Sequence, residues 1–165
     1  MNSKENNFAY IDGANLHKGV GDLGWKLDYR RFRIWLKDKF KVGRAYLFIG
    51  LVPENKDLYT KLQEMGYILV YKEVTYDGSG KVKGNCDADL VLKTVVDFYE
   101  KNFDKAVLIS SDGDYSGLVK FLIEKNKFGA ILSPAVAQKC SILLKRTGAN
   151  IIYINDQKSL LSRAK

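Results

Sequence analysis

Residues 106–114 of the chain read AVLISSDGD, an apolar run of four residues that continues through two serines into Asp112 and Asp114. A short, uninterrupted apolar run is typical of a strand that is buried on both faces of a parallel sheet. Open α/β sheets bind their ligands beyond the carboxyl ends of such strands. The two aspartates therefore stand where this kind of fold places functional side chains.

The same order of apolar and acidic residues occurs near the start of the chain, where residues 8–12 read FAYID. With the strands at 8–11 and 106–110, similar runs predict strands at 44–49, 67–71, 129–132 and 151–154. Apolar residues at helical spacing predict helices at 28–39, 54–64, 86–102, 114–125, 136–146 and 157–163. This alternation predicts an α/β fold in which helices cover both faces of a mostly parallel central sheet, as three layers. The length of 165 residues suits one domain, residues 1–165.

The preference for right-handed crossovers limits the order of the strands. We expect the first three strands to run outward from the centre of the sheet, and the strand at 106–110 to lie on the other side of the first. The order of the sheet then reverses between the first and fourth strands, so Asp12 and Asp112 become neighbours.

Asp12, Asp87, Asp112 and Asp114 are the candidate ligands of a metal ion at this edge. Two like charges about 4 Å apart repel by roughly 4 kcal/mol at an effective dielectric constant of 20. A hard cation that prefers oxygen ligands, such as Mg²⁺ or Mn²⁺, removes this repulsion. Helix capping is the alternative role for Asp12 and Asp114, because aspartate is a favoured N-cap residue. No such structural role is evident for Asp112.

Helical spacing distinguishes the two acidic residues at the start of the helix predicted at 86–102. Asp89 shares a stripe with Lys93, Asp97 and Glu100, which we expect to face water. Asp87 shares a stripe with Val91, Val95 and Phe98, which we expect to pack on the sheet. The spacing therefore favours Asp87 as the site residue and leaves Asp89 as an outer alternative.

The chain has a net charge of +8, from 27 basic and 19 acidic residues. A basic surface around an acidic centre favours a polyanionic partner, although lysines that only aid solubility are the alternative. The polar start MNSKENN has no apolar segment of a signal peptide, and no apolar run approaches the length of a membrane span. The two cysteines form no CxxC pair, so we expect a reducing, cytoplasmic setting.

Four further residues are candidates for contact with a bound substrate. Asn15 and Ser111 are placed to orient a carboxylate or a phosphate. Lys83 belongs to the glycine-rich segment 75–84, for which we expect a hairpin or flap leading to Asp87, with a plain surface connection as the alternative. Tyr115 can stack on a base, as can Tyr76, with packing as the alternative for both. Other basic candidates are Arg30, Arg31, Arg33, Lys81, Lys139, Lys145 and Arg146.

Two motif matches fail on their context. Residues 19–24 fit the GxGxxG fingerprint by letter, but they begin well after the first strand, and no acidic residue closes the second strand. Residues 112–117 resemble the start of a calcium EF-hand loop, but the twelfth position is Ile123 instead of the required glutamate.

Three motifs together resemble the NYN domain family, relatives of the PIN-domain ribonucleases, and in particular its LabA-like branch. They are Ile-Asp-Gly-Ala-Asn at 11–15, Lys-Gly-Asn-Cys-Asp at 83–87 and Ser-Ser-Asp-Gly-Asp-Tyr at 110–115. The resemblance extends from Phe8 to about Asp156. It implies a PIN-like α/β/α sandwich and RNA cleavage that depends on Mg²⁺ or Mn²⁺, leaving a 5′-phosphate and a 3′-hydroxyl.

The sequence therefore predicts a metal-dependent endoribonuclease that acts on single-stranded RNA through Asp12, Asp87, Asp112 and Asp114. The main alternative is a non-catalytic nucleic-acid-binding module that retains the acidic pocket. A phosphatase for small molecules and a nuclease for structured DNA are weaker alternatives. A short domain of this kind is expected to gain specificity from self-association or from a protein partner.

Overall fold

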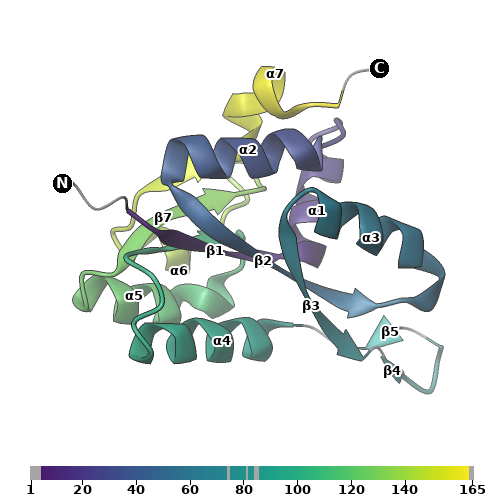
Figure 1. Cartoon of the computed structure of the whole chain (residues 1–165), viewed down its shortest axis with the longest axis horizontal. Helices are drawn as coiled ribbons and strands as arrows, with labels where there is room; N and C mark the ends of the chain where they lie inside the picture. Colours follow the sequence, from purple (N-terminus) through teal and green to yellow (C-terminus); the bar gives the residue numbers. More distant parts are fainter. Residues whose placement is uncertain (1–4, 74, 81, 84–85, 164–165) are drawn as a thin grey trace.

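The computed structural model describes residues 5–73, 75–80, 82–83 and 86–163, and it contains the predicted alternation of strands and helices. Six strands form one sheet in the order β3-β2-β1-β6-β7-β8, and every neighbouring pair is parallel (Figure 1). The fourth long strand therefore lies beside the first, as predicted. The order of the sheet reverses between β1 and β6, which is where α/β sheets open a crevice for ligands.

The strands of the sheet are β1 (Asn7–Asp12), β2 (Val42–Leu51), β3 (Tyr67–Glu73), β6 (Ala106–Ile109), β7 (Phe128–Ser133) and β8 (Ile151–Tyr153). The helices are α1 (Gly13–Asp22), α2 (Tyr29–Phe40), α3 (Lys56–Glu64), α4 (Asp87–Tyr99), α5 (Ser116–Glu124), α6 (Ile142–Lys145) and α7 (Lys158–Leu161). Short 3₁₀ turns are η1 (Pro53–Asn55), η2 (Gly113–Tyr115) and η3 (Ile154–Gln157). Within the described part of the chain, no helix is both long enough and apolar enough to cross a membrane.

A separate antiparallel pair, β4 (Thr75–Tyr76) and β5 (Val82–Lys83), lies outside the main sheet. Thr75 pairs with Lys83, and Tyr76 pairs with Val82. Between them, the N–H of Ser79 donates to the Asp77 carboxylate at 2.9 Å, which is a local turn bond of the kind that aspartate favours. The hairpin expected for this segment is therefore present.

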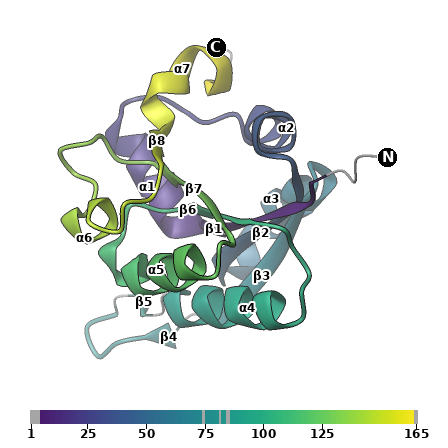
Figure 2. The same ribbon diagram turned by 90° about the vertical axis from the view of Figure 1, so that its left-hand side faces the viewer.

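Two apolar cores lie on opposite faces of the sheet, because successive side chains of a strand point to opposite sides. In β1, Ala9 and Ile11 belong to the first core, whereas Phe8 and Tyr10 belong to the second. Helices α1, α2, α3 and α7 contribute to the first core, and α4, α5 and α6 to the second (Figure 2). The three-layer α/β/α prediction is confirmed.

Helix α1 was not predicted from the sequence, because three glycines within ten residues weaken the helical pattern. Two of these glycines lie at close contacts. A Cβ atom added to Gly13 would lie 2.6 Å from the carbonyl oxygen of Phe48, and one added to Gly19 would lie 2.5 Å from the Cβ atom of Pro134. Close packing of α1 therefore requires residues that lower its intrinsic helix propensity.

The helix predicted at 136–146 is wrong over its first half, since α6 covers only Ile142–Lys145. Ser141 caps this short helix, and its Oγ atom accepts a hydrogen bond from the N–H of Leu143 at 3.1 Å. A serine that bonds to the backbone in this way favours the start of a helix over its interior. The N–H of Ser141 also donates to the carbonyl oxygen of Ser111 at 3.2 Å, which ties this turn to the loop after β6.

Candidate metal centre

Three aspartates from separate elements meet at the carboxyl edge of the sheet. Asp12 ends β1, Asp112 lies three residues beyond β6, and Asp87 begins α4. Among the described residues, one carboxylate oxygen from each lies within 4.8 Å of the oxygens from the other two. We call Asp12, Asp87 and Asp112 the acidic triad. The pairing of β1 with β6 brings the first and last of them together.

Asp12 is 8% exposed and both of its carboxylate oxygens accept hydrogen bonds. Oδ1 accepts from the N–H of Asn15 at 3.1 Å, and Oδ2 accepts from the hydroxyl of Tyr115 at 3.1 Å. Asp12 is thus the N-cap of α1 and a member of the triad at the same time. Burial raises the pKa of the Asp12 carboxyl, the charges of Asp87 and Asp112 raise it further, and its two hydrogen bonds oppose the shift.

Asp112, and not Asp114, caps the turn after β6. Oδ1 of Asp112 accepts from the N–H of Asp114 at 2.9 Å, so Asp112 is the N-cap of η2. The expectation that Asp112 has no structural role is therefore wrong. The N–H of Asp112 donates to Oγ of Ser110 at 3.1 Å. Ser110 is fully buried, and no sequence signal identified it as a support of this loop.

Asp114 is exposed and lies outside the triad, next to Asp87. Burial is the largest cause that raises the pKa of the Asp87 carboxyl, the charges of Asp112 and Asp114 add to it, and a bond from Tyr115 opposes it. A carboxyl-to-carboxyl hydrogen bond with Asp114 raises this pKa as well. Asp114 therefore adds a fourth carboxyl group at the rim of the triad.

The face that α4 buries differs from the one predicted by its helical spacing. Leu90, Thr94 and Asp97 are the buried residues of this helix, so the prediction that Asp97 faces water is wrong. The Asp97 carboxylate accepts from the hydroxyl of Tyr10 at 2.6 Å and from the Lys93 ammonium at 3.0 Å. These bonds compensate the buried charge, which hydrophobic periodicity alone does not reveal.

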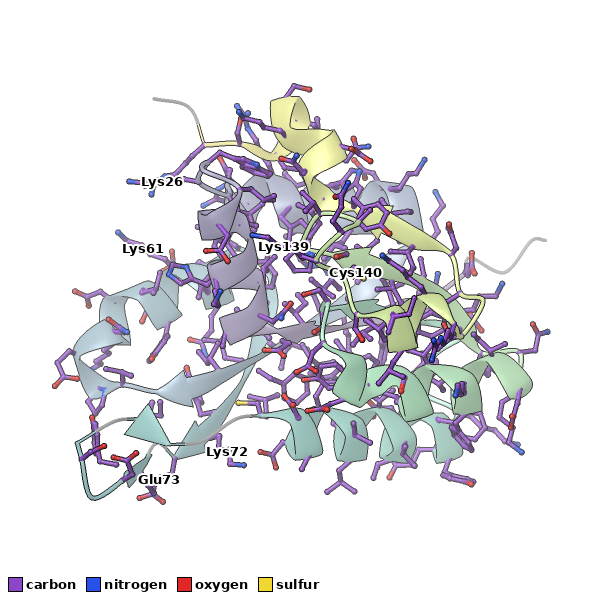
Figure 3. All side chains as sticks on the ribbon, turned by 180° about the vertical axis from the view of Figure 1, so that it is seen from behind. Lys26, Lys61, Lys72, Glu73, Lys139 and Cys140 are labelled. Atoms are coloured by element: carbon purple, nitrogen blue, oxygen red, sulfur yellow. The ribbon has the colours of Figure 1, made fainter. Side chains whose placement is uncertain are left out.

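The structure nevertheless separates Asp87 from Asp89. Asp87 belongs to the triad, whereas the Asp89 side chain is 47% exposed and lies 3.7 Å from the ammonium of Lys72. Lys72 lies near the end of β3, beside the start of α4 (Figure 3). A basic group therefore neutralises Asp89 at the border of the acidic edge.

Tyr115 does not offer its ring for stacking on a base, because it is fully buried. Its hydroxyl instead lies 3.1 Å from an oxygen of Asp12 and 2.8 Å from an oxygen of Asp87. A tyrosine hydroxyl has one proton and can donate only one of these two bonds at a time. Burial and the two carboxylates raise the pKa of the Tyr115 hydroxyl, so it remains protonated. Tyr115 therefore positions two members of the triad.

Asn15 and Ser111, both predicted to orient a ligand, bond to each other. Oδ1 of Asn15 accepts from the N–H of Ser111 at 2.9 Å and from its hydroxyl at 3.2 Å. Because a backbone N–H only donates, this contact fixes the orientation of the amide. The Nδ2 group of Asn15 makes no hydrogen bond within the described part of the chain, so it can donate to a ligand.

The remaining basic and aromatic candidates are more dispersed. The side chain of Lys83 and residue Lys81 lie outside what the structure describes. Tyr76 in the hairpin is 68% exposed, which leaves its ring accessible. Arg33 was a candidate for contact with a phosphate. Its guanidinium instead donates to the carbonyl oxygens of Val42, Gly43 and Gly66.

The triad fits a divalent cation in both donor type and size. Oxygens bound to one Mg²⁺ at about 2.1 Å lie roughly 3.0 to 4.2 Å apart in octahedral geometry. The separations in the triad are at most 4.8 Å, so small rotations of the side chains bring the oxygens into this range. Burial, and to a lesser extent their mutual repulsion, raises the pKa of Asp12 and Asp87, and a bound cation would favour their ionised forms.

Fold and site together define an α/β protein with the PIN-like nuclease fold and an acidic centre at the carboxyl edge of its sheet. The chain belongs to the NYN domain family, whose pattern matches residues 9–154. It is 24% identical to the low amplitude and bright protein LabA of Synechococcus elongatus, over 93% of this chain and 86% of that protein. The crystal structure of a Vibrio parahaemolyticus protein of unknown function has the same fold, with a TM-score of 0.77 and 22% identity over 98% of this chain and 99% of that chain.

Proposed function

We propose that this protein is a metal-dependent endoribonuclease that hydrolyses phosphodiester bonds of RNA. The observation that carries the proposal is the convergence of Asp12, Asp87 and Asp112 at the switch point of the sheet. Membership of the NYN family supports a nuclease over other metal-binding functions. The net charge of +8 supports a polyanionic substrate.

The triad would hold Mg²⁺ or Mn²⁺, which lowers the pKa of water and neutralises charge that builds on a phosphate. Asp114 at the rim adds negative charge beside Asp87, where a second ion or a water molecule can bind. Tyr115 holds the carboxylates of Asp12 and Asp87 in place through its hydroxyl. The Nδ2 group of Asn15 donates to a phosphate oxygen, and Ser111 keeps that amide turned toward the substrate.

The substrate would be single-stranded RNA, cleaved to leave a 5′-phosphate and a 3′-hydroxyl, in the cytoplasm. We also propose that self-association or a protein partner adds selectivity for particular RNAs. Sedimentation would test this: a monomer that cuts one RNA selectively would contradict it.

The decisive test is incubation of labelled single-stranded RNA with Mn²⁺, Mg²⁺ or EDTA. We expect cleavage only with a metal ion, and we expect Asp112→Asn to reduce its rate by about 100-fold or more, because loss of a ligand exceeds the usual cost of losing a group around a metal site. Asp57→Asn, an exposed residue of α3, is the control with the same change of charge. Equal rates for the two variants would contradict the proposal.

The alternative is a non-catalytic nucleic-acid-binding module, and one observation favours it. Asp12 and Asp112 each cap a helical turn, so a structural role can retain both carboxylates. This alternative predicts that RNA remains intact with every metal ion, while binding to RNA persists and weakens with salt.

A further inference from the structure

A cavity of about 680 Å³ lies on the face of the sheet that carries the first core. Its walls are α1, the carboxyl end of β2, helix α3 and the segment that leads into α2. This volume is within the range of about 300–1,000 Å³ that is typical of small-molecule sites. The cavity is separate from the acidic triad, since none of the three aspartates lines it.

The cavity combines aromatic walls with a basic rim. Trp25 and Tyr59 line it, and the Tyr59 hydroxyl is held by the N–H of Val52 at 3.0 Å and the carbonyl oxygen of Gly50 at 3.2 Å. Apart from tyrosines, the ionisable residues among the described lining are all basic: His17, Lys26 and Arg163. A flat ring that carries a phosphate would use both parts of the cavity, because the basic groups attract its negative charge.

The lining of the cavity begins directly beside the acidic triad. Gly13 and Ala14 line it, and they follow Asp12 in the chain. Two steps between Cα atoms span at most about 7.6 Å. One nucleotide advances a strand by roughly 3.4 Å in a stacked helix, and further when it is extended. Tyr115, which bonds to Asp12 and Asp87, belongs to the second core, so a strand of RNA that reaches both sites would cross the carboxyl edge at the start of α1.

We propose that this cavity binds one nucleotide of the RNA, with the base against the apolar lining and its phosphate at the basic rim. Lys26 of the rim is exposed, and Figure 3 shows Lys26 and Lys61 projecting from the same side of the molecule. A mostly apolar lining accepts the ring of any base, and basic groups add a contact that weakens with salt. The proposal rests on the proposed function for the identity of its ligand, and it makes the cavity a subsite next to the cleavage site.

Binding can be measured without any cleavage, because Trp25 is a natural reporter. The chain has two tryptophans, and Trp35→Phe leaves Trp25 as the only one. We would titrate this variant with each of the four nucleoside monophosphates in EDTA and follow Trp25 fluorescence. A saturable quench supports the proposal, and its absence for all four overturns it.

Two variants are designed to obstruct the cavity. Gly21 lines it and has nothing within 4 Å of an added Cβ atom, so Gly21→Leu directs a side chain into open space. Leu58, 51% exposed on the opposite wall, is changed to glutamate. We expect each to weaken nucleotide binding by about tenfold or more, the loss typical of a small change of volume in an apolar pocket. Gly117→Leu in α5 is the matched control, since Gly117 also has open space but does not line the cavity.

Lys26→Ala tests the basic rim, with Lys125→Ala at the end of α5 as control. We expect the first variant, and not the second, to remove the preference for a nucleoside monophosphate over the free nucleoside. The same weakening in Gly117→Leu as in Gly21→Leu would overturn the proposal. Quenching of Trp25 without RNA cleavage would support the nucleotide site and contradict the proposed nuclease function. Metal-dependent cleavage without quenching would support the nuclease function and contradict the nucleotide site.

Discussion

The hydroxyl of Tyr115 lies between two carboxylates that are held close together, and this contact sets the electrostatics of the site. One proton cannot satisfy two ionised carboxylates at once. Without a cation, a proton on Asp12 or Asp87 can supply positive charge, since burial raises the pKa of both groups although the bonds from Tyr115 lower it. Tyr115 thus supports the triad whether a proton or a metal ion supplies the missing positive charge.

Removing this hydroxyl isolates its contribution to stability and to metal binding. Tyr115→Phe keeps the buried ring but removes both bonds, and we expect the free energy of unfolding to fall by about 1–3 kcal/mol. We also expect affinity for Mn²⁺ to fall by about 10- to 100-fold, because the carboxylates lose the group that orients them. Urea unfolding and calorimetry measure the two effects. Tyr153→Phe, half-buried in the second core, is the control, and equal effects in both variants would contradict the assigned role.

The raised pKa of Asp12 and Asp87 determines the sign of the pH dependence. In the folded protein the neutral form of each group is favoured relative to the unfolded chain. Their contribution to stability is therefore greatest below the unfolded pKa, and it is lost as the pH rises through the raised folded pKa. Above the raised folded pKa values and without metal, the ionised carboxylates oppose folding.

Asp87→Asn should accordingly raise the melting temperature at neutral pH in EDTA. With Mn²⁺ the order should reverse, because a ligand at 100 times its Kd stabilises the wild-type protein by about 2.7 kcal/mol and the variant gains less. Thermal unfolding at several pH values, with Asp57→Asn as control, measures both effects. A lower melting temperature of Asp87→Asn in EDTA would show that the other contacts of Asp87 outweigh the repulsion.

Among the elements, α1 illustrates a conflict between helix propensity and packing. Gly19 and Gly21 lie two residues apart in this helix, and only the first has a close neighbour. We expect Gly21→Ala to raise the free energy of unfolding by up to about 1 kcal/mol, through helix propensity alone. Gly19→Ala places its Cβ atom against Pro134 and should lower it by about 1–3 kcal/mol, because overpacking outweighs the gain. Urea unfolding compares the pair, and equal stabilisation by both would refute the close contact.

The elements also show which features a sequence can predict. The strands were predicted because a short apolar run is a local property, and the strand-end aspartates followed from them. Helix α1 was not predicted because two of its glycines are required by close contacts with β2 and Pro134, which are distant in the sequence. The buried face of α4 was not predicted because it carries Asp97. Hydrogen bonds from Tyr10 and Lys93 compensate the buried charge of this carboxylate. The position of Tyr115 between two carboxylates depends on three separate elements at once, so no local pattern encodes it.

At the scale of the whole molecule, the carboxyl and amino edges of the sheet carry different groups. The triad lies at the carboxyl edge, where β1 and β6 end, and the proposed nucleotide site opens beside it. Lys139 lies in the turn that follows the carboxyl end of β7. Lys125 precedes the amino end of the same strand. The net charge of the chain is +8, and each of these two lysines contributes one charge. If RNA binds along the carboxyl edge, Lys139 should contribute more to RNA binding than Lys125.

Salt dependence measures that difference directly. For a single strand, the logarithm of affinity falls against the logarithm of salt concentration by about 0.7 for each phosphate that a basic group contacts. We therefore expect Lys139→Ala to reduce this slope by about 0.7 in binding assays with single-stranded RNA in EDTA. Lys125→Ala at the opposite edge should leave the slope unchanged. Equal reductions in both variants would mean that RNA is attracted to the overall charge of the protein, and that the carboxyl edge has no preferred path for the strand.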